Sequence, residues 1–193
     1  MSAQPVEAAH LPKWLRNAPA HGWTVEDVLN LPEDAPRVEL VDGEIRVVPS
    51  PTIGHQRVSG LIWNWLRLNA PSEYDVIFAV GVAINFRNTR EPDVLLLQRD
   101  QVEDTRHFMP SDAVVLAVEV VSDGSKRVDR IKKPREYAAA GIPHYWRVEL
   151  KPTITIHAYE LRGESYTQVA EASDELVLER PFEIRLPIAD ITP

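Results

Sequence analysis

One apolar, β-prone stretch of the chain, Val114-Val115-Leu116-Ala117-Val118-Glu119-Val120-Val121, contains a single acid, and a second stretch, Glu91-Pro92-Asp93-Val94-Leu95-Leu96-Leu97, carries Asp93 near its start. Short apolar runs of this kind predict buried strands. A carboxylate in a buried strand is costly unless it meets a cation, a hydrogen-bond network or water. We therefore expect Asp93 and Glu119 to face one shared site, for which a hard divalent metal ion is the simplest ligand.

The composition is that of a soluble protein with a hydrophobic core. The chain has 193 residues, of which 44% are hydrophobic and 26% charged, and it contains no cysteine, which excludes disulfides and thiolate metal sites. The N-terminal residues lack the basic start and apolar core of a signal peptide, and no apolar stretch is long enough to span a membrane, so we expect a cytoplasmic location. The net charge of −8 weighs against a nucleic-acid substrate.

The chain is predicted to form an N-terminal arm and one domain. Residues 1–22 contain Pro5, Pro12 and Pro19, which indicates a flexible arm, and residues 23–193 form the domain. A hairpin is expected over residues 38–48, turning at Asp42-Gly43. Apolar spacing and capping predict helices over residues 25–31, 54–69 and 128–140. Strands are predicted over residues 75–80, 81–85, 93–97, 113–121, 144–149, 153–160, 165–170 and 175–178, with a tail near 182–186, which indicates an α+β fold around one sheet.

Six segments together resemble a known family. They are Val38-Glu39-Leu40-Val41-Asp42-Gly43-Glu44, Pro49-Ser50-Pro51 followed by His55, Glu91-Pro92-Asp93-Val94, Val118-Glu119-Val120-Val121-Ser122, Asp129 followed by Lys133 and Tyr137, and Ala140-Gly141-Ile142-Pro143-His144-Tyr145-Trp146-Arg147-Val148-Glu149. In this order the chain resembles the PD-(D/E)XK nuclease superfamily and, more narrowly, the bacterial Uma family of putative restriction endonucleases. The resemblance implies a restriction-endonuclease-like core, with a central mixed sheet flanked by helices and extra C-terminal strands.

The resemblance also implies a reaction, the hydrolysis of DNA phosphodiester bonds with Mg²⁺ or Mn²⁺. Asp93 and Glu119 would bind the metal, joined by Glu39 directly or through water. Such an ion lowers the pKa of its bound water and polarises a phosphoryl oxygen. The superfamily lysine expected two residues after Glu119 is replaced by Val121. The resemblance assigns its role to Lys133 from the following helix, with Lys132 and Lys126 as alternatives.

Several further residues have two interpretations. His55 would position a phosphate or water, or is an ordinary helix residue. Asp129 would support Lys133, or forms with it a simple i, i+4 surface pair. The bases Lys126, Arg130 and Lys132 would hold a phosphate backbone, or belong to a solvated helix.

The function itself also has more than one interpretation. A homodimer is expected by analogy, and RNA is an alternative polymer to DNA. The missing lysine and the acidic net charge also fit a catalytically inactive nuclease fold that acts as an interaction or regulatory module, and a non-nuclease metal hydrolase on the same scaffold is a third interpretation.

Overall fold

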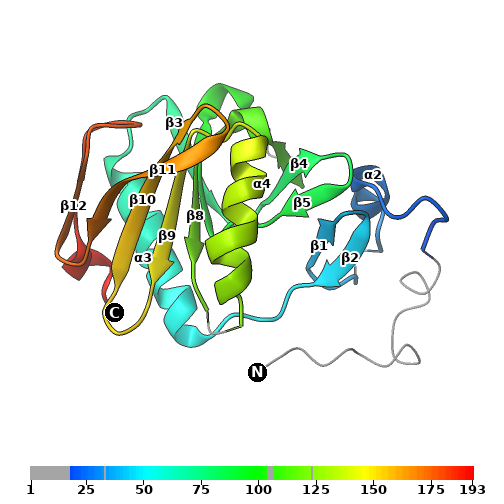
Figure 1. The fold of residues 1–193 in the computed structure, drawn as a ribbon, viewed down its shortest axis with the longest axis horizontal. Coiled ribbons are helices and arrows are strands. Elements are labelled where there is room, and N and C mark those ends of the chain that lie inside the picture. The colour runs from blue at the N-terminus through cyan, green and yellow to red at the C-terminus, as the bar shows by residue number, and fades with distance from the viewer. Residues whose placement is uncertain (1–17, 33, 104–106, 123) are drawn as a thin grey trace.

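A six-stranded mixed sheet forms the centre of the molecule (Figure 1). The computed structural model describes residues 18–32, 34–103, 107–122 and 124–193, so most of the predicted arm, residues 1–17, lies outside the described residues. The strand order is β11-β10-β9-β8-β6-β3, and the pairs are antiparallel except β8 with β9. The strands are β3 (Tyr74–Phe78), β6 (Val94–Gln98), β8 (Val114–Val120), β9 (His144–Glu149), β10 (Thr155–Arg162) and β11 (Ser165–Ala172). The predicted α+β class with a mixed sheet is confirmed.

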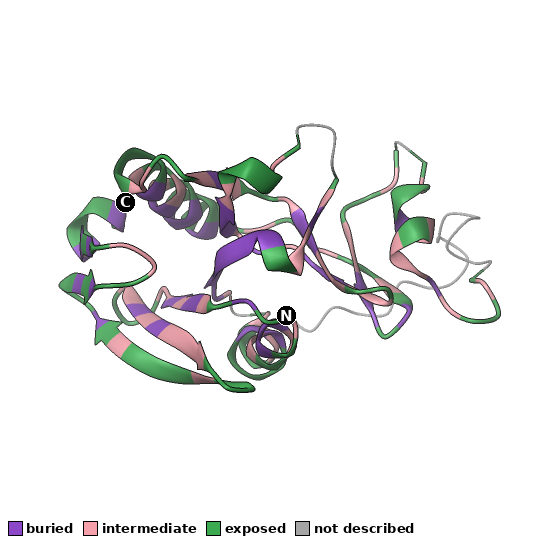
Figure 2. Cartoon of the chain, turned by 90° about the horizontal axis from the view of Figure 1, so that it is seen from above, coloured by how far each residue is buried: buried purple, intermediate pink, exposed green. Residues whose placement is uncertain are grey.

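Strand β8 is buried along its whole length because it has a neighbour on each side and a helix over each face. Leu116, Val118 and Val120 belong to the same buried cluster as the apolar residues of helix α3 (Ile53–Asn69), whereas Val114 and Ala117 belong to the cluster of Tyr137 from helix α4 (Lys133–Ala139). Figure 2 shows the buried residues concentrated in the strands between the two helices and on the helix faces turned towards them. A strand covered on both faces usually has an almost continuous run of apolar residues in its sequence. A charged residue such as Glu119 is therefore unusual in β8.

Helix α3 follows the predicted helical periodicity closely. Thr52 caps its N-terminus by accepting a hydrogen bond from the His55 N–H (3.3 Å). Val58, Ile62 and Leu66 form its buried stripe, each at most 2% exposed. The helix ends at Asn69, ahead of Ala70-Pro71, as the sequence predicts.

The segment predicted as one helix over residues 128–140 departs from that regularity. Its first part, Val128–Lys132, is a π-helix, and α4 follows over Lys133–Ala139. Pro134 lies in the first turn of α4 and has no N–H, and its ring would clash with a carbonyl four residues earlier in a regular helix. The wider turn avoids that clash, with the Lys133 N–H donating to the Val128 carbonyl. Gly141, at a φ of 78°, follows the end of the helix.

Smaller sheets flank the central one. Helix α2 (Val25–Leu29) precedes the hairpin of β1 (Val38–Val41) and β2 (Glu44–Val47), which turns at Asp42 and Gly43 with positive φ angles of 53° and 81°, as predicted from Asp-Gly. Strand β4 (Gly81–Asn85) pairs with β5 (Asn88–Arg90) and β7 (Phe108–Pro110), two strands absent from the sequence prediction because they are short and mostly lack apolar alternation. A final hairpin, β12 (Glu175–Leu178) with β13 (Ile184–Pro187), and the 3₁₀ turn Ile188–Ile191 pack against the α3 side of the core.

The other predicted boundaries differ by a few residues. Strand β10 begins two residues later than predicted and extends to Arg162, and β11 extends to Ala172. Over the described ranges, no helix has both the length and the apolarity needed to cross a lipid bilayer.

Candidate active site

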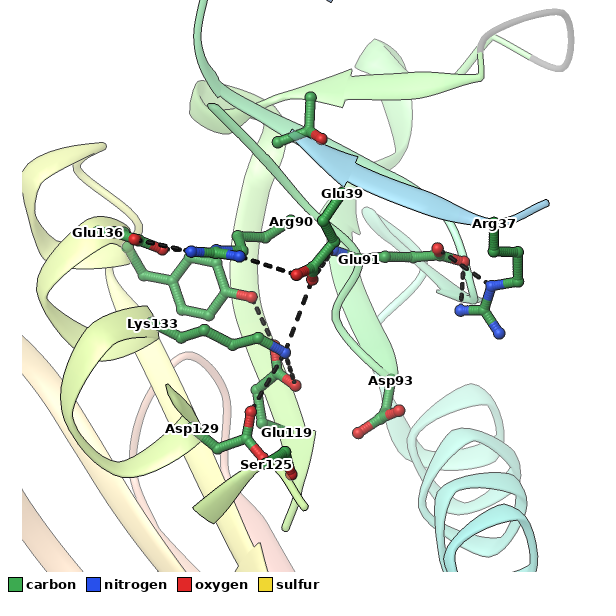
Figure 3. A network of polar contacts seen from close by, with 12 residues as sticks. Arg37, Glu39, Arg90, Glu91, Asp93, Glu119, Ser125, Asp129, Lys133 and Glu136 are labelled. Atoms are coloured by element: carbon green, nitrogen blue, oxygen red, sulfur yellow. Dashed lines mark hydrogen bonds and ion pairs between the residues drawn. The ribbon is translucent and has the colours of Figure 1, made fainter. Parts of the chain in front are cut away.

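Asp93 and Glu119 are neighbours in the register of β6 and β8. Val94 pairs with Val118, and the Asp93 N–H donates to the Val118 carbonyl (3.0 Å), so the next position along the ladder sets Asp93 against Glu119. Asp93 lies directly before β6, and its side chain contacts His55 of α3, whereas the Glu119 side chain contacts Tyr137 of α4. Figure 3 shows the Glu119 carboxylate beside Lys133 and Asp129, with Asp93 on the neighbouring segment and no drawn contact between Asp93 and Lys133. The two strands therefore bring these acids to one end of the sheet.

Glu119 is buried among hydrogen-bond donors of α4. It is 2% exposed, its Oε2 accepts from the Lys133 Nζ (2.7 Å) and its Oε1 accepts from the Tyr137 hydroxyl (2.5 Å). Burial raises the pKa of Glu119 well above its ordinary value, against the opposing charge of Lys133, and the nearby Asp129 and Asp93 raise it further. Two hydrogen bonds thus fix the position of the Glu119 carboxylate, but the positive charge of Lys133 does not fully offset the cost of burying it.

Lys133 lies among three carboxylates. Its Nζ is 2.7 Å from Glu119 Oε2, 3.3 Å from Asp129 Oδ1 and 3.9 Å from Glu39 Oε1, and the residue is 8% exposed. Burial alone would lower the pKa of Lys133, but the charges of Glu119, Asp129 and Glu39 outweigh it and raise the pKa, so the ammonium stays charged. Of the three candidate lysines, Lys133 is the one placed against Glu119, whereas Lys126 and Lys132 are exposed.

The π-helix places Asp129 beneath Lys133. Asp129 is 1% exposed, and the Tyr145 hydroxyl donates to its main-chain carbonyl (2.7 Å). Its Oδ1 meets Lys133 at ion-pair distance without the geometry of a hydrogen bond. Burial raises the pKa of Asp129 even though Lys133 opposes this. The interpretation of Asp129 and Lys133 as a solvated surface pair is therefore wrong, because both side chains are buried.

Asp93 is held from the other side of the sheet by His55. Its Oδ2 accepts from the Val120 N–H (2.7 Å) and lies 3.2 Å from His55 Nε2. Burial alone would lower the pKa of His55, but the hydrogen bond and charge of Asp93 outweigh it and raise the pKa. Among the described residues, both of these contacts are made by Oδ2 of Asp93. They fix the orientation of the carboxylate, and Oδ1 takes part in neither.

Glu39 reaches the cluster through a contact between the first hairpin and β5. The Leu40 N–H donates to Thr89 Oγ1 (2.9 Å), which fixes β1 against β5. The Glu39 Oε2 then lies 2.8 Å from Arg90 Nη1, and its Oε1 accepts from the Glu91 N–H (3.3 Å). Glu39 is thus next to Lys133 but is held by Arg90.

Arg90 and Glu136 are site residues that the sequence prediction missed. Arg90 is 2% exposed, and its Nε and Nη2 lie 2.5 Å and 2.8 Å from the two carboxylate oxygens of Glu136 on α4. This bidentate pair ties β5 to α4 and closes one side of the cluster (Figure 3). Tyr137 is fully buried in the core, and its hydroxyl also donates to Glu119 in the site. The four-residue spacing of Asp129, Lys133 and Tyr137 was the signal available for that role.

The three predicted phosphate-binding bases lie on or just before the π-helix. Lys126, Arg130 and Lys132 are all exposed. Arg130 makes two hydrogen bonds to the carboxylate of Glu149 (2.8 Å and 2.9 Å). Their role toward a phosphate backbone stays a prediction.

The charges and donors of the cluster fit a divalent cation that is completed by water and substrate. Over the described residues, no three His, Cys, Asp or Glu side chains converge closely enough to hold a metal ion. Mg²⁺ is commonly bound by one or two carboxylates together with water and substrate phosphates, so the binding of a metal ion by Asp93 and Glu119 stays a prediction. Burial is the main cause of the raised pKa values of Glu119 and Asp129, and any nearby cation would oppose both shifts.

A mixed sheet with acids on adjoining strands and a lysine from the next helix defines the restriction-endonuclease-like class. The chain belongs to the Uma2 family, described as "Putative restriction endonuclease", whose sequence profile matches residues 25–189. This confirms the resemblance stated above.

A solved structure shows the same fold. The crystal structure of a putative nuclease belonging to DUF820 from Anabaena variabilis ATCC 29413 superposes with a TM-score of 0.69 at 16% sequence identity, covering 88% of this chain and 97% of that chain. At this identity the likeness shows the fold alone. No curated protein matches the sequence.

Proposed function

We propose that this protein is a metal-dependent endonuclease that hydrolyses DNA phosphodiester bonds. The observation that carries the proposal is the buried Lys133 ammonium, 2.7 Å from the Glu119 carboxylate, whose neighbour across the strand pair is Asp93. A lysine, two acids and a strand register of this kind combine a cation-binding pair with a fixed positive charge. Family membership supports a nucleic-acid substrate.

Each residue of the cluster has a role in this proposal. Asp93 and Glu119 would hold Mg²⁺ or Mn²⁺, and Glu39 would contact it through water. The bound ion supplies an activated water and shields the phosphate charge. Lys133 would orient the attacking water or stabilise the charge that develops on the phosphate oxygens, because a preorganised ammonium costs little reorganisation during the reaction.

The surrounding residues act by positioning Asp93, Glu119, Glu39 and Lys133. The Tyr137 hydroxyl fixes one oxygen of Glu119, and the other oxygen accepts from Lys133. Asp129 holds the Lys133 side chain from beneath, and His55 holds Oδ2 of Asp93. Arg90 keeps Glu39 at the edge of the cluster. These are positioning roles, because each acts on a proposed ligand or on the proposed catalytic lysine.

The net charge of −8 does not describe the surface next to the site. The residues before the π-helix, the π-helix itself and the first turn of α4 present exposed basic residues, namely Lys126, Arg127, Arg130, Lys132 and Arg135. Basic side chains contact phosphates and set the register of a nucleic acid without reading its sequence. We propose that this segment contacts the DNA backbone beside the cleaved bond.

The proposal is tested by incubating supercoiled plasmid, single-stranded DNA and RNA with the wild type in Mn²⁺, Mg²⁺ or EDTA. We expect metal-stimulated nicking of DNA that EDTA abolishes and that Asp93→Ala loses. Asp190→Ala, which removes an exposed carboxylate near the C-terminus, is the matched control and should cleave like the wild type. Metal binding without cleavage of any polynucleotide would instead favour the catalytically inactive interaction module.

A further inference from the structure

A hollow of about 320 Å³ opens on the α3 side of Asp93. Its wall includes Gln56, Gly60 and Trp63 of α3, Phe78 at the end of β3, Arg37 before β1, and Asp93 itself. Asp93 therefore belongs both to this hollow and to the carboxylate–lysine cluster. A molecule in the hollow would lie directly beside the group that we propose to bind the metal.

An aromatic pair forms one wall. Phe78 is 57% exposed, and its ring meets that of Trp63 edge to face, with centroids 5.3 Å apart and planes at 77°. The Trp63 indole N–H donates to the Val76 carbonyl (2.9 Å), and the Arg67 guanidinium lies 5.3 Å from its ring centre. Trp63 is thus held in one orientation, and it supports an aromatic ring that is largely open to solvent.

The rim of the hollow carries polar and basic groups. The Arg37 side chain is 48% exposed and pairs with Glu91, two residues before Asp93. Gln56 is exposed on α3, and its amide can both donate and accept hydrogen bonds. Next to Phe78, Ala79 adopts a φ of 55°, an uncommon conformation for a residue with a side chain, which turns the chain sharply at the wall.

We propose that this hollow receives an unpaired nucleobase of the polynucleotide, adjacent to the phosphate at the carboxylate–lysine cluster. The inference rests on the proposed nuclease function and specifies its substrate. Every base has a flat π-face that stacks on an exposed aromatic ring, whereas a base within an intact duplex is already stacked and paired. The occupant is a base because the hollow joins an open aromatic wall to a basic rim and runs into the proposed phosphate site.

The consequence is a preference for single-stranded or locally unpaired DNA over intact duplex. The aromatic wall would hold the base and the Arg37 charge would lie near the backbone. Stacking tolerates any base, so this site would not read a sequence by itself.

Gly60 offers a way to fill the hollow without disturbing the core. A Cβ at Gly60 would meet no atom within 4 Å, and the same is true at Gly54 in the first turn of the same helix, which does not line the hollow. Gly60→Leu therefore occupies the hollow, and Gly54→Leu is the matched control. Thermal unfolding should show that both variants fold.

The experiment measures binding of a single-stranded oligonucleotide containing 2-aminopurine, with the wild-type protein in EDTA so that no cleavage occurs. We expect quenching of the probe by the wild type and by Gly54→Leu, and a loss of affinity of about 5- to 100-fold in Gly60→Leu, the range that base–aromatic stacking supplies. Phe78→Ala should weaken binding in the same direction. Equal binding by Gly60→Leu and Gly54→Leu would overturn the inference.

A parallel cleavage assay in Mn²⁺ separates this inference from the nuclease proposal. If the wild type cleaves DNA and Gly60→Leu cleaves single strands as well as Gly54→Leu does, the nuclease proposal stands and the base site is overturned. If no protein cleaves but Gly60→Leu alone loses probe quenching, the base site stands and the nuclease proposal fails. If Gly60→Leu changes the sedimentation coefficient instead of probe binding, the hollow is a contact between copies and the inference is overturned.

Discussion

The two helical segments that cover the central sheet differ in what they bury. Helix α3 is regular and buries an apolar stripe of Val58, Ile62 and Leu66. The segment from Val128 to Ala139 begins as a π-helix and buries Asp129, Lys133 and Tyr137, whose polar atoms converge on Glu119. One face of the sheet is therefore stabilised by apolar packing, and the other accepts the cost of buried charge.

This difference separates stability from chemistry in the molecule. Apolar burial is non-directional and tolerates regular geometry, whereas a charged cluster needs each group at a defined distance. The π-turn and Pro134 set the position of Lys133 relative to Asp129, and π-helical turns of this kind occur frequently at functional sites. We therefore expect substitutions in the buried apolar stripe of α3 to affect folding and substitutions of the buried polar residues in the second segment to affect activity.

The largest expected effect is on stability in α3. Ile62 is fully buried, and Ile62→Ala should lower the free energy of unfolding by about 2–5 kcal/mol, because it removes apolar contacts and leaves a cavity. Leu68→Ala, at a position 66% exposed on the same helix, should change it by less than about 0.5 kcal/mol. Urea unfolding followed by circular dichroism measures both. Equal effects of the two substitutions would remove the basis for assigning the core to this face.

The next effect is on catalysis in the second segment. Lys133→Met should lower the rate of DNA cleavage by about 10²- to 10³-fold, which corresponds to the loss of one preorganised donor at the transition state. The neighbouring exposed lysine provides the control, and Lys132→Met should retain the wild-type rate apart from weaker DNA binding at higher salt. Single-turnover kinetics at saturating protein separates a loss of the cleavage rate from a loss of DNA binding. A variant with Met at position 133 that cleaves normally would exclude Lys133 from the reaction.

A smaller effect concerns the pH dependence of stability. Burial raises the pKa of Glu119 above its ordinary value of 4.5, so the folded protein retains a proton that the unfolded chain releases. Stability from this group is therefore present below about pH 4.5 and is lost as pH rises through the raised folded pKa, with a slope of up to about 1.4 kcal/mol for each pH unit. Glu119→Gln cannot titrate and should show a flatter decline in metal-free buffer, with the remaining slope partly due to Asp129. An unchanged slope would show that Glu119 does not carry this dependence.

The smallest effect on stability is expected at the π-turn. Pro134→Ala restores an N–H that can donate to the Arg130 carbonyl, which would convert the wide turn to α-helical geometry. We expect a change in unfolding free energy below about 1 kcal/mol, together with a clear loss of cleavage as Lys133 shifts against Glu119. Pro187→Ala, at the end of strand β13, is the control for a proline far from the cluster. Unaltered activity in Pro134→Ala would mean that the π-turn does not set the site geometry.

The sequence predicted the parts of the site that follow from local pattern. An acid in a continuous apolar strand marked Glu119, and the family resemblance, carried by Asp129 followed by Lys133 and Tyr137, indicated the helix that faces it. The large elements were also predictable, because α3 follows helical periodicity and Asp42-Gly43 specifies a hairpin turn. Both the site residues and the large elements were predicted from residues that are close together in the sequence.

The rest of the site depends on contacts between distant segments. Arg90 is buried because β5 forms beside β4 and β1 packs against it, and no periodicity in Asn88-Thr89-Arg90 predicts this. Glu39 could not be assigned to a face by alternation, and its partners, Arg90 and Lys133, come from two other elements. The π-turn arises from the conflict between Pro134 and a regular helix, in a span that the sequence predicted as one helix over residues 128–140. Such tertiary contacts override local propensity.

The most direct test of the carboxylate–lysine cluster is anomalous diffraction from crystals of the wild-type protein soaked in Mn²⁺. We expect a peak roughly 2.1–2.5 Å from carboxylate oxygens of Asp93 and Glu119, with the Lys133 ammonium beside it, and no such peak in crystals of Asp93→Ala. Occupied Mn²⁺ sites elsewhere, with nothing between Asp93 and Glu119, would contradict the assignment of these two acids as the metal site.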